Sequence, residues 1–112
     1  SMYPTLNPGD LIFDTAVKDT SALQIGDIIT YWTVIDGERV LNTHRISAIY
    51  DGGGYLIFQT RGDNNTMDDP LTVHESEVVG QFSGKKIGLR RYCVRVVCLP
   101  APLFLQRKLV SL

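Results

Sequence analysis

The sequence predicts a mainly β domain with little helix. Short apolar or β-branched runs alternate with turn signals along the chain, and helical periodicity is weak everywhere. Ten glycines and five prolines in 112 residues also suit a fold that is rich in turns. A chain of this length is expected to form one domain, residues 1–112, whose core needs no disulfide or metal to hold it together.

The first half of the chain contains three predicted strands. The first strand is expected at residues 10–14 and the second at residues 27–35. Asp36-Gly37 follows as a strong signal for a two-residue hairpin, because this pair tolerates the left-handed backbone that such turns need. The partner strand of the hairpin is therefore expected over residues 38–50.

The second half continues the alternation of strands and turns. A strand at residues 55–60 leads into a polar loop at 61–70, and residues 73–79 fit either one short helical turn or the start of a strand. Two late strands are expected, at residues 78–82 and 87–97.

Charge is unevenly distributed along the chain. The formal net charge of −1 gives no reason to expect a nucleic-acid partner. The segment 83–112 is nevertheless basic as well as apolar, a composition that suits a membrane surface as much as a protein core. No run reaches the roughly 18 apolar residues of a membrane-spanning helix.

Three groups of residues could carry chemistry. Ser1 opens a segment, 1–6 followed by 8–10, in which Pro4 and Pro8 restrict the backbone, so that it could present a nucleophile. A Ser-Met start is also typical of a residue left from cloning. His44 lies in a predicted strand. It is either a structural histidine or a general base, since the ordinary pKa of histidine, about 6.5, suits proton transfer near neutrality. His74, the second histidine, lies in an acidic and exposed stretch and is given no function.

The third group is the acidic loop with Asp63, Asp68 and Asp69. It could be a solvated turn, a metal loop with oxygen ligands, or the source of a carboxylate that orients a base. An EF-hand calcium loop needs acids at alternate positions and a later glutamate, and this spacing does not fit it. Serine, histidine and aspartate together supply the three roles of an acyl-transfer triad.

The order of these motifs resembles that of the type I signal peptidases. Their nucleophile box, Gly-Asp turn, general-base box and last acidic box all have counterparts in the first 69 residues of the chain. The matching segments are residues 1–6 with 9–10, residues 26–31, residues 44–46, and residues 62–65 with 68–69.

The base box identifies the branch that the chain resembles. Most bacterial and mitochondrial members have lysine where this chain has His44, whereas the endoplasmic-reticulum and archaeal branch, and some Gram-positive members, have histidine. The resemblance implies Ser1 as nucleophile, His44 as general base and Asp69 as the orienting carboxylate, with Asp63 as a structural or secondary acid. It implies a mostly antiparallel β fold, and neither a cofactor nor a metal.

The resemblance also implies partners and a location. The substrates would be signal peptides of secreted preproteins, cut after small residues in an Ala-x-Ala-like pattern. The enzyme would be membrane-anchored, with its catalytic domain at the lipid surface on the extracytoplasmic or lumenal face. Because the chain begins at Ser1 within a motif, we expect the anchor to lie upstream, outside this sequence. Candidate substrate-binding residues lie in the nucleophile segment and in the second strand: Met2, Tyr3, Pro4, Ile29 and Tyr31.

Some features of the chain depart from the resemblance or allow other functions. The segment 83–112 matches no box, and we expect it to pack near the bilayer or between protomers. A related self-cleaving repressor is one alternative, although its lysine base has no counterpart at position 44. A non-catalytic signal-peptidase-like module is a second. A third is an enzyme that uses the α-amine of Ser1, which extension of the N-terminus would inactivate.

Overall fold

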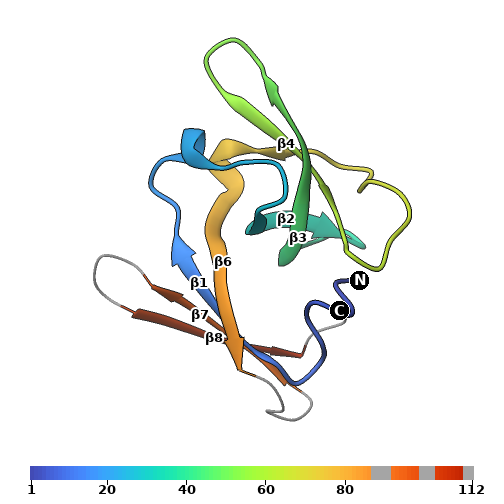
Figure 1. Ribbon diagram of the computed structural model, residues 1–112, viewed down its shortest axis with the longest axis vertical. Coiled ribbons are helices and arrows are strands. Elements are labelled where there is room, and N and C mark those ends of the chain that lie inside the picture. Colours follow the sequence, from blue (N-terminus) through green and yellow to red (C-terminus); the bar gives the residue numbers. More distant parts are fainter. Residues whose placement is uncertain (87–91, 99–102, 110–112) are drawn as a thin grey trace.

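A computed structural model describes residues 1–86, 92–98 and 103–109, with side chains through residue 84. The described residues form a single sheet with the strand order β5-β4-β3-β2-β6-β1-β7-β8 (Figure 1). The strands are β1 (Leu11–Ala16), β2 (Ile28–Ile35), β3 (Glu38–Asp51), β4 (Leu56–Arg61), β5 (Val73–His74), β6 (Val78–Lys86), β7 (Tyr92–Cys98) and β8 (Leu103–Leu109). Two 3-10 turns, η1 (Thr20–Ala22) and η2 (Glu75–Glu77), complete the described elements.

The predicted fold class is confirmed, and so are most of the predicted strands. Five predicted strands coincide with β1, β2, β3, β4 and β6 to within a few residues at each end. Residues 73–79 contain both alternatives, the short strand β5 and the 3-10 turn η2. The late strand expected at 87–97 appears as β7, with residues 87–91 outside the described residues, and β8 was not predicted.

The sheet is antiparallel at every junction except one. β1 pairs in parallel with β7, and it pairs antiparallel with β6 on its other side. β6 is the strand that joins the two halves of the sheet, because it pairs with β1 and also with β2 (Figure 1).

The hairpin between β2 and β3 forms at the predicted turn. Asp36 and Gly37 have φ angles of 51° and 78°, the left-handed conformation that a two-residue turn of this kind requires. The turn fixes a register in which Ile29 pairs with His44, and Tyr31 with Asn42. Because paired residues share a face of the sheet, all four side chains lie on the same side.

Two hydrophobic clusters lie on opposite faces of β2. Ile29 and Tyr31 belong to the first cluster, whereas Ile28 belongs to the second, which also contains Met2 and Leu6. The other buried members of the first cluster are Leu23, Ile46, Phe58 and Val73, and the second also contains Ile12. Both clusters position the candidate site, since Ile29 of the first pairs with His44, and Met2 and Leu6 of the second belong to the N-terminal segment.

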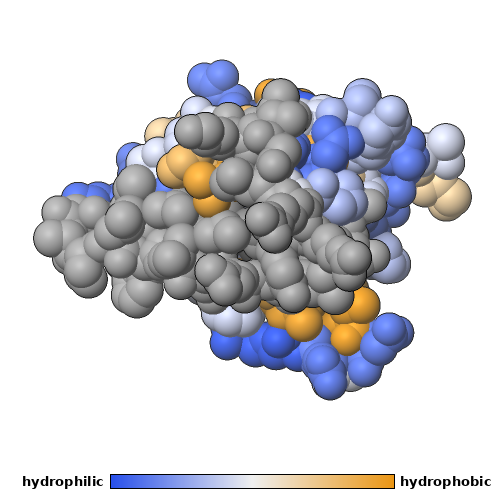
Figure 2. Space-filling model, turned by 90° about the horizontal axis from the view of Figure 1, so that it is seen from below, coloured by the Kyte–Doolittle hydropathy of each residue, from blue (hydrophilic) through white to orange (hydrophobic). Residues whose placement is uncertain are grey.

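On the face shown in Figure 2, most of the coloured surface is hydrophilic, and the visible apolar residues form separate groups. Within the residues that the structure describes, no helix has the length and apolarity needed to cross a membrane.

Candidate active site

Ser1, His44 and Asp69 form a hydrogen-bonded chain. Ser1 Oγ lies 3.0 Å from His44 Nε2, and His44 Nδ1 lies 2.5 Å from Asp69 Oδ2. His44 is only 5% exposed. A proton on Nδ1 would be donated to Asp69, which leaves the lone pair of Nε2 to accept the hydroxyl proton of Ser1.

Ser1 is held in place by the backbone of the acidic loop and by the second hydrophobic cluster. The backbone N–H of Asn64 donates to the carbonyl oxygen of Ser1 over 2.7 Å. The next side chain, Met2, is fully buried, and its carbonyl oxygen accepts from Leu6 N at 3.0 Å. The segment between them contains a cis peptide bond at Tyr3-Pro4. The N-terminal serine is thus fixed through its own backbone and through its neighbours.

Gly62 allows the acidic loop to come this close to Ser1. A Cβ atom at Gly62 would lie 2.6 Å from the carbonyl oxygen of Ser1 and 2.8 Å from the side-chain nitrogen of Asn65. Such distances are well inside van der Waals contact, so only glycine fits without a shift of the chain.

Asp69 lies at the end of this loop, where β4 holds it. Its backbone N–H donates to Thr60 O at 2.8 Å, and Gln59 Nε2 donates to the Asp69 carbonyl at 2.8 Å. The carboxylate oxygen Oδ2 accepts from Thr60 Oγ1 at 2.6 Å and from the Tyr31 hydroxyl at 3.3 Å, in addition to His44. Burial disfavours the charge of this carboxyl, but the hydrogen bonds from His44, Thr60 and Tyr31 outweigh burial and hold the pKa of Asp69 below its usual value.

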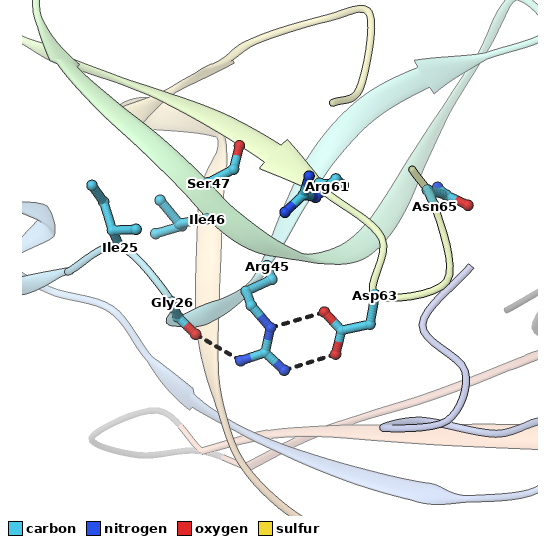
Figure 3. A pocket seen from close by; sticks show the side chains of 8 residues that line it. All are labelled: Ile25, Gly26, Arg45, Ile46, Ser47, Arg61, Asp63 and Asn65. Carbon is cyan, nitrogen blue, oxygen red and sulfur yellow. Dashed lines mark hydrogen bonds and ion pairs between the residues drawn. The ribbon is translucent and has the colours of Figure 1, made fainter. Parts of the chain in front are cut away.

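Asp63 lies in a different arrangement from Asp69. Its two oxygens accept from Nε and Nη2 of Arg45, at 2.8 and 2.7 Å, and Thr5 Oγ1 donates to it at 2.5 Å. Arg45 also donates to the carbonyl oxygen of Gly26 at 2.8 Å (Figure 3). The guanidinium of Arg45 is the main reason that the pKa of Asp63 is lowered. This ion pair joins residues of all four motifs recognised in the sequence.

The predicted substrate-binding residues divide by exposure. Met2 and Ile29 are fully buried in the two clusters, whereas Tyr3 is 57% exposed and Pro4 is also exposed. Tyr31 is 2% exposed and lines a pocket of about 170 Å³ together with His44 and Asp69. The part of these residues in substrate binding stays a prediction.

The other predicted acid and the second histidine lie apart from this chain of hydrogen bonds. Asp68 is exposed, and His74 is exposed on β5, where its ring stacks on Tyr55 at 5.0 Å between centroids. Among the residues that the structure describes, no group of three or more His, Cys, Asp or Glu side chains could hold a metal ion.

Sequence reasoning missed three residues of the site. Thr60 donates a hydrogen bond to Asp69, and Asn42 donates one to the Tyr31 hydroxyl. Gly62 permits the acidic loop to approach Ser1. Thr60 and Asn42 lie in predicted strands without any motif around them, so only the register of β2, β3 and β4 shows their proximity. Gly62 belongs to a recognised motif, but its role depends on a contact with the distant Ser1.

A β-sheet domain that aligns serine, imidazole and carboxylate in this order has the geometry of acyl-transfer hydrolases, in which histidine accepts the serine proton and aspartate orients the imidazole.

Comparison with known proteins identifies the family. The chain is 38% identical over 84 residues to signal peptidase I W of Bacillus subtilis (strain 168), an alignment that covers 75% of this chain and 43% of that protein.

Eukaryotic relatives agree with the bacterial one. The chain is 31% identical over 70 residues to the signal peptidase complex catalytic subunit SEC11C of Homo sapiens, covering 62% of this chain and 35% of that subunit. It is 33% identical over 69 residues to the catalytic subunit SEC11 of Clavispora lusitaniae, covering 62% and 39%. The chain belongs to the type I signal peptidase family, with relatives of both the Gram-positive and the eukaryotic type.

The alignments cover only part of each relative. The chain spans less than half the length of the curated relatives named here. No family model matches the chain, and no solved structure matches it at a significant level.

Proposed function

We propose that this chain is the catalytic part of a serine endopeptidase that removes signal peptides from secreted preproteins. The observation that carries the proposal is the chain of hydrogen bonds from Ser1 through His44 to Asp69, in a member of the signal peptidase family. Its substrates are expected to be cut after small residues, in an Ala-x-Ala-like pattern.

The mechanism is acyl transfer. His44 Nε2 takes the proton of Ser1 Oγ while the oxygen attacks the scissile carbonyl, and Asp69 stabilises the resulting imidazolium. The C–N bond then breaks, the amine of the mature protein leaves with the proton from His44, and the signal peptide stays bound to Ser1 as an ester. His44 next deprotonates a water molecule, which hydrolyses the ester and restores Ser1.

Family membership also supports a proposal for the location of the domain. We place the catalytic domain on the extracytoplasmic or lumenal face of a membrane, at the lipid surface, where an emerging signal peptide can reach it. An anchor upstream of Ser1 would hold the domain there.

Processing of a preprotein by the membrane-anchored enzyme tests the proposal. Ser1→Ala and His44→Ala are each expected to lower the rate of signal-peptide removal by about 10⁴-fold or more, because residues that act as one unit fail together. His74→Ala is the matched control, since it removes the other, exposed histidine and should leave processing unchanged. Processing at a near wild-type rate by His44→Ala would contradict the mechanism.

A further inference from the structure

Three further polar side chains, the buried Tyr31 and Thr60 and the half-buried Asn42, form a hydrogen-bonded group next to Asp69. The Tyr31 hydroxyl is 3.3 Å from Asp69 Oδ2 and 3.1 Å from Thr60 Oγ1, and Asn42 Nδ2 donates to the Tyr31 hydroxyl oxygen at 3.3 Å. The side chains come from β2, β3 and β4, so the contact depends on the register of three strands.

The donors and acceptors in this group can be assigned in only a few ways. Thr60 has a single hydroxyl proton, and its 2.6 Å contact with the Asp69 carboxylate takes that proton. The Tyr31 hydroxyl accepts from the Asn42 amide and therefore directs its own proton toward Thr60 Oγ1 and Asp69 Oδ2. The two hydroxyl protons are thus directed toward the carboxylate oxygen that holds His44, that of Thr60 directly and that of Tyr31 between Thr60 Oγ1 and Asp69 Oδ2, while the Asn42 amide orients the Tyr31 hydroxyl.

The surroundings keep these groups in one orientation. Thr60 is fully buried and Tyr31 is 2% exposed, with its ring packed in the first hydrophobic cluster. Burial, reinforced by the charge of Asp69, raises the pKa of Tyr31, so its hydroxyl keeps the proton that it donates. Hydrogen bonds among buried groups of this kind fix orientation, because leaving one unmade is costly.

We propose that Tyr31 is a positioning residue of the active site, whose hydroxyl, together with Thr60, holds the Asp69 carboxylate ionised and aimed at His44 Nδ1. The proposal rests on the proposed function for its catalytic consequence, although the effect of Tyr31 on Asp69 does not depend on catalysis. It gives Tyr31 a role different from the substrate contact that the sequence suggested.

Tyr31→Phe tests the proposal because it removes the hydroxyl and keeps the buried ring. We expect kcat for preprotein processing by the anchored enzyme to fall about 2- to 10-fold, the rate equivalent of one hydrogen bond, with KM unchanged. The ionisable side chains that face Asp69 are His44 from β3 and Tyr31 from β2, and Asp63 interacts with the charge of His44. Since Asp69 loses a donor to its charged form, the acidic limb of the pH–rate profile should move to higher pH.

Two further variants sharpen the test. Thr60→Val should act in the same direction. The double variant should lose less than the product of the two single losses, because the Tyr31 hydroxyl also contacts Thr60 and acts on Asp69 in part through it. Tyr50→Phe removes a hydroxyl from an exposed tyrosine on β3 and should leave kcat and the pH profile as in the wild type.

Proton NMR of the His44 Nδ1–H separates this proposal from the proposed function. In the inactive Ser1→Ala background, Tyr31→Phe should shift this signal downfield, because a carboxylate with fewer donors is a stronger acceptor for Nδ1. An unshifted signal in the folded variant would overturn the role of Tyr31, as would a rise in KM at unchanged kcat, which would indicate substrate contact. Failure of Ser1→Ala to abolish processing would instead overturn the proposed function alone.

Discussion

Three acids were candidates to orient His44, and their side-chain contacts differ sharply. Asp69 accepts from His44, Thr60 and Tyr31, Asp63 is paired with Arg45, and Asp68 is exposed. The neighbours Asp68 and Asp69 therefore form a natural pair for comparison, because they share the loop and differ in what they contact.

Asp69→Asn should lower the rate of preprotein processing by at least about 10²-fold, because a neutral amide cannot stabilise the imidazolium and can favour the wrong tautomer of His44. Asp68→Asn should leave the rate as in the wild type. The measurement is initial rate with the anchored enzyme, with circular dichroism to verify the fold. Equal rates for the two variants would exclude Asp69 as the orienting group.

The acidic loop and the N-terminal segment meet at Gly62, and this contact sets the position of Ser1. The methyl group introduced by Gly62→Ala would lie too close to the carbonyl oxygen of Ser1. The clash must shift Ser1 and move its hydroxyl away from His44. We expect a loss of activity of about 10²-fold, the effect of a shift near 1 Å at a reacting group, while the strands still form. Gly53→Ala, with open space around its Cβ position, controls for the loss of a glycine, although its positive φ adds local strain. Unchanged activity in Gly62→Ala would show that Ser1 tolerates the shift.

The strands could be predicted from the sequence to a greater extent than the site. Apolar and β-branched runs and the Asp36-Gly37 turn locate β2 and β3, because both signals are local. The contacts of Tyr31 with Asp69 and Thr60 depend on cross-strand register, including the irregularity between Ile46 and Ala48 in the pairing of β3 with β4. Serine, histidine and aspartate could be chosen only through the resemblance to a family, since each residue alone has a common structural explanation.

At the scale of the whole domain, the catalytic candidates lie on segments that are anchored in two hydrophobic clusters, one on each face of β2. Met2 in one cluster adjoins Ser1, while Ile46 and Phe58 in the other belong to β3 and β4, the strands that carry His44 and Thr60. The Arg45–Asp63 ion pair connects β3, the strand that carries His44, with the N-terminal segment that carries Ser1, because Asp63 also accepts a hydrogen bond from Thr5. The stability of the domain and the geometry of the site should therefore respond together to the charge of Asp63.

Acid is expected to destabilise the domain through Asp63 and Asp69. Both carboxyls have pKa values below their usual range in the folded protein, so the unfolded chain binds protons first as the pH falls. Their contribution to the free energy of unfolding is fully present above the unfolded pKa, about 4, and is lost as the pH falls through the lower folded values. Urea unfolding of the chain at pH 7, 5, 4 and 3 should give a plateau down to about pH 5 and a decline below about pH 4.

Asp63→Asn isolates one part of this loss. The variant should be less stable at pH 7 by roughly 1 kcal/mol, a modest value because solvent screens the partly exposed Arg45. It should also lose less stability than the wild type between pH 7 and pH 3, since Asp63, a carboxyl with a lowered pKa, is gone. Asp68→Asn, which alters an exposed carboxyl, should follow the wild-type curve. If Asp63→Asn and the wild type lost the same free energy of unfolding between pH 7 and pH 3, the Arg45–Asp63 pair would not stabilise the contact between β3 and the N-terminal segment.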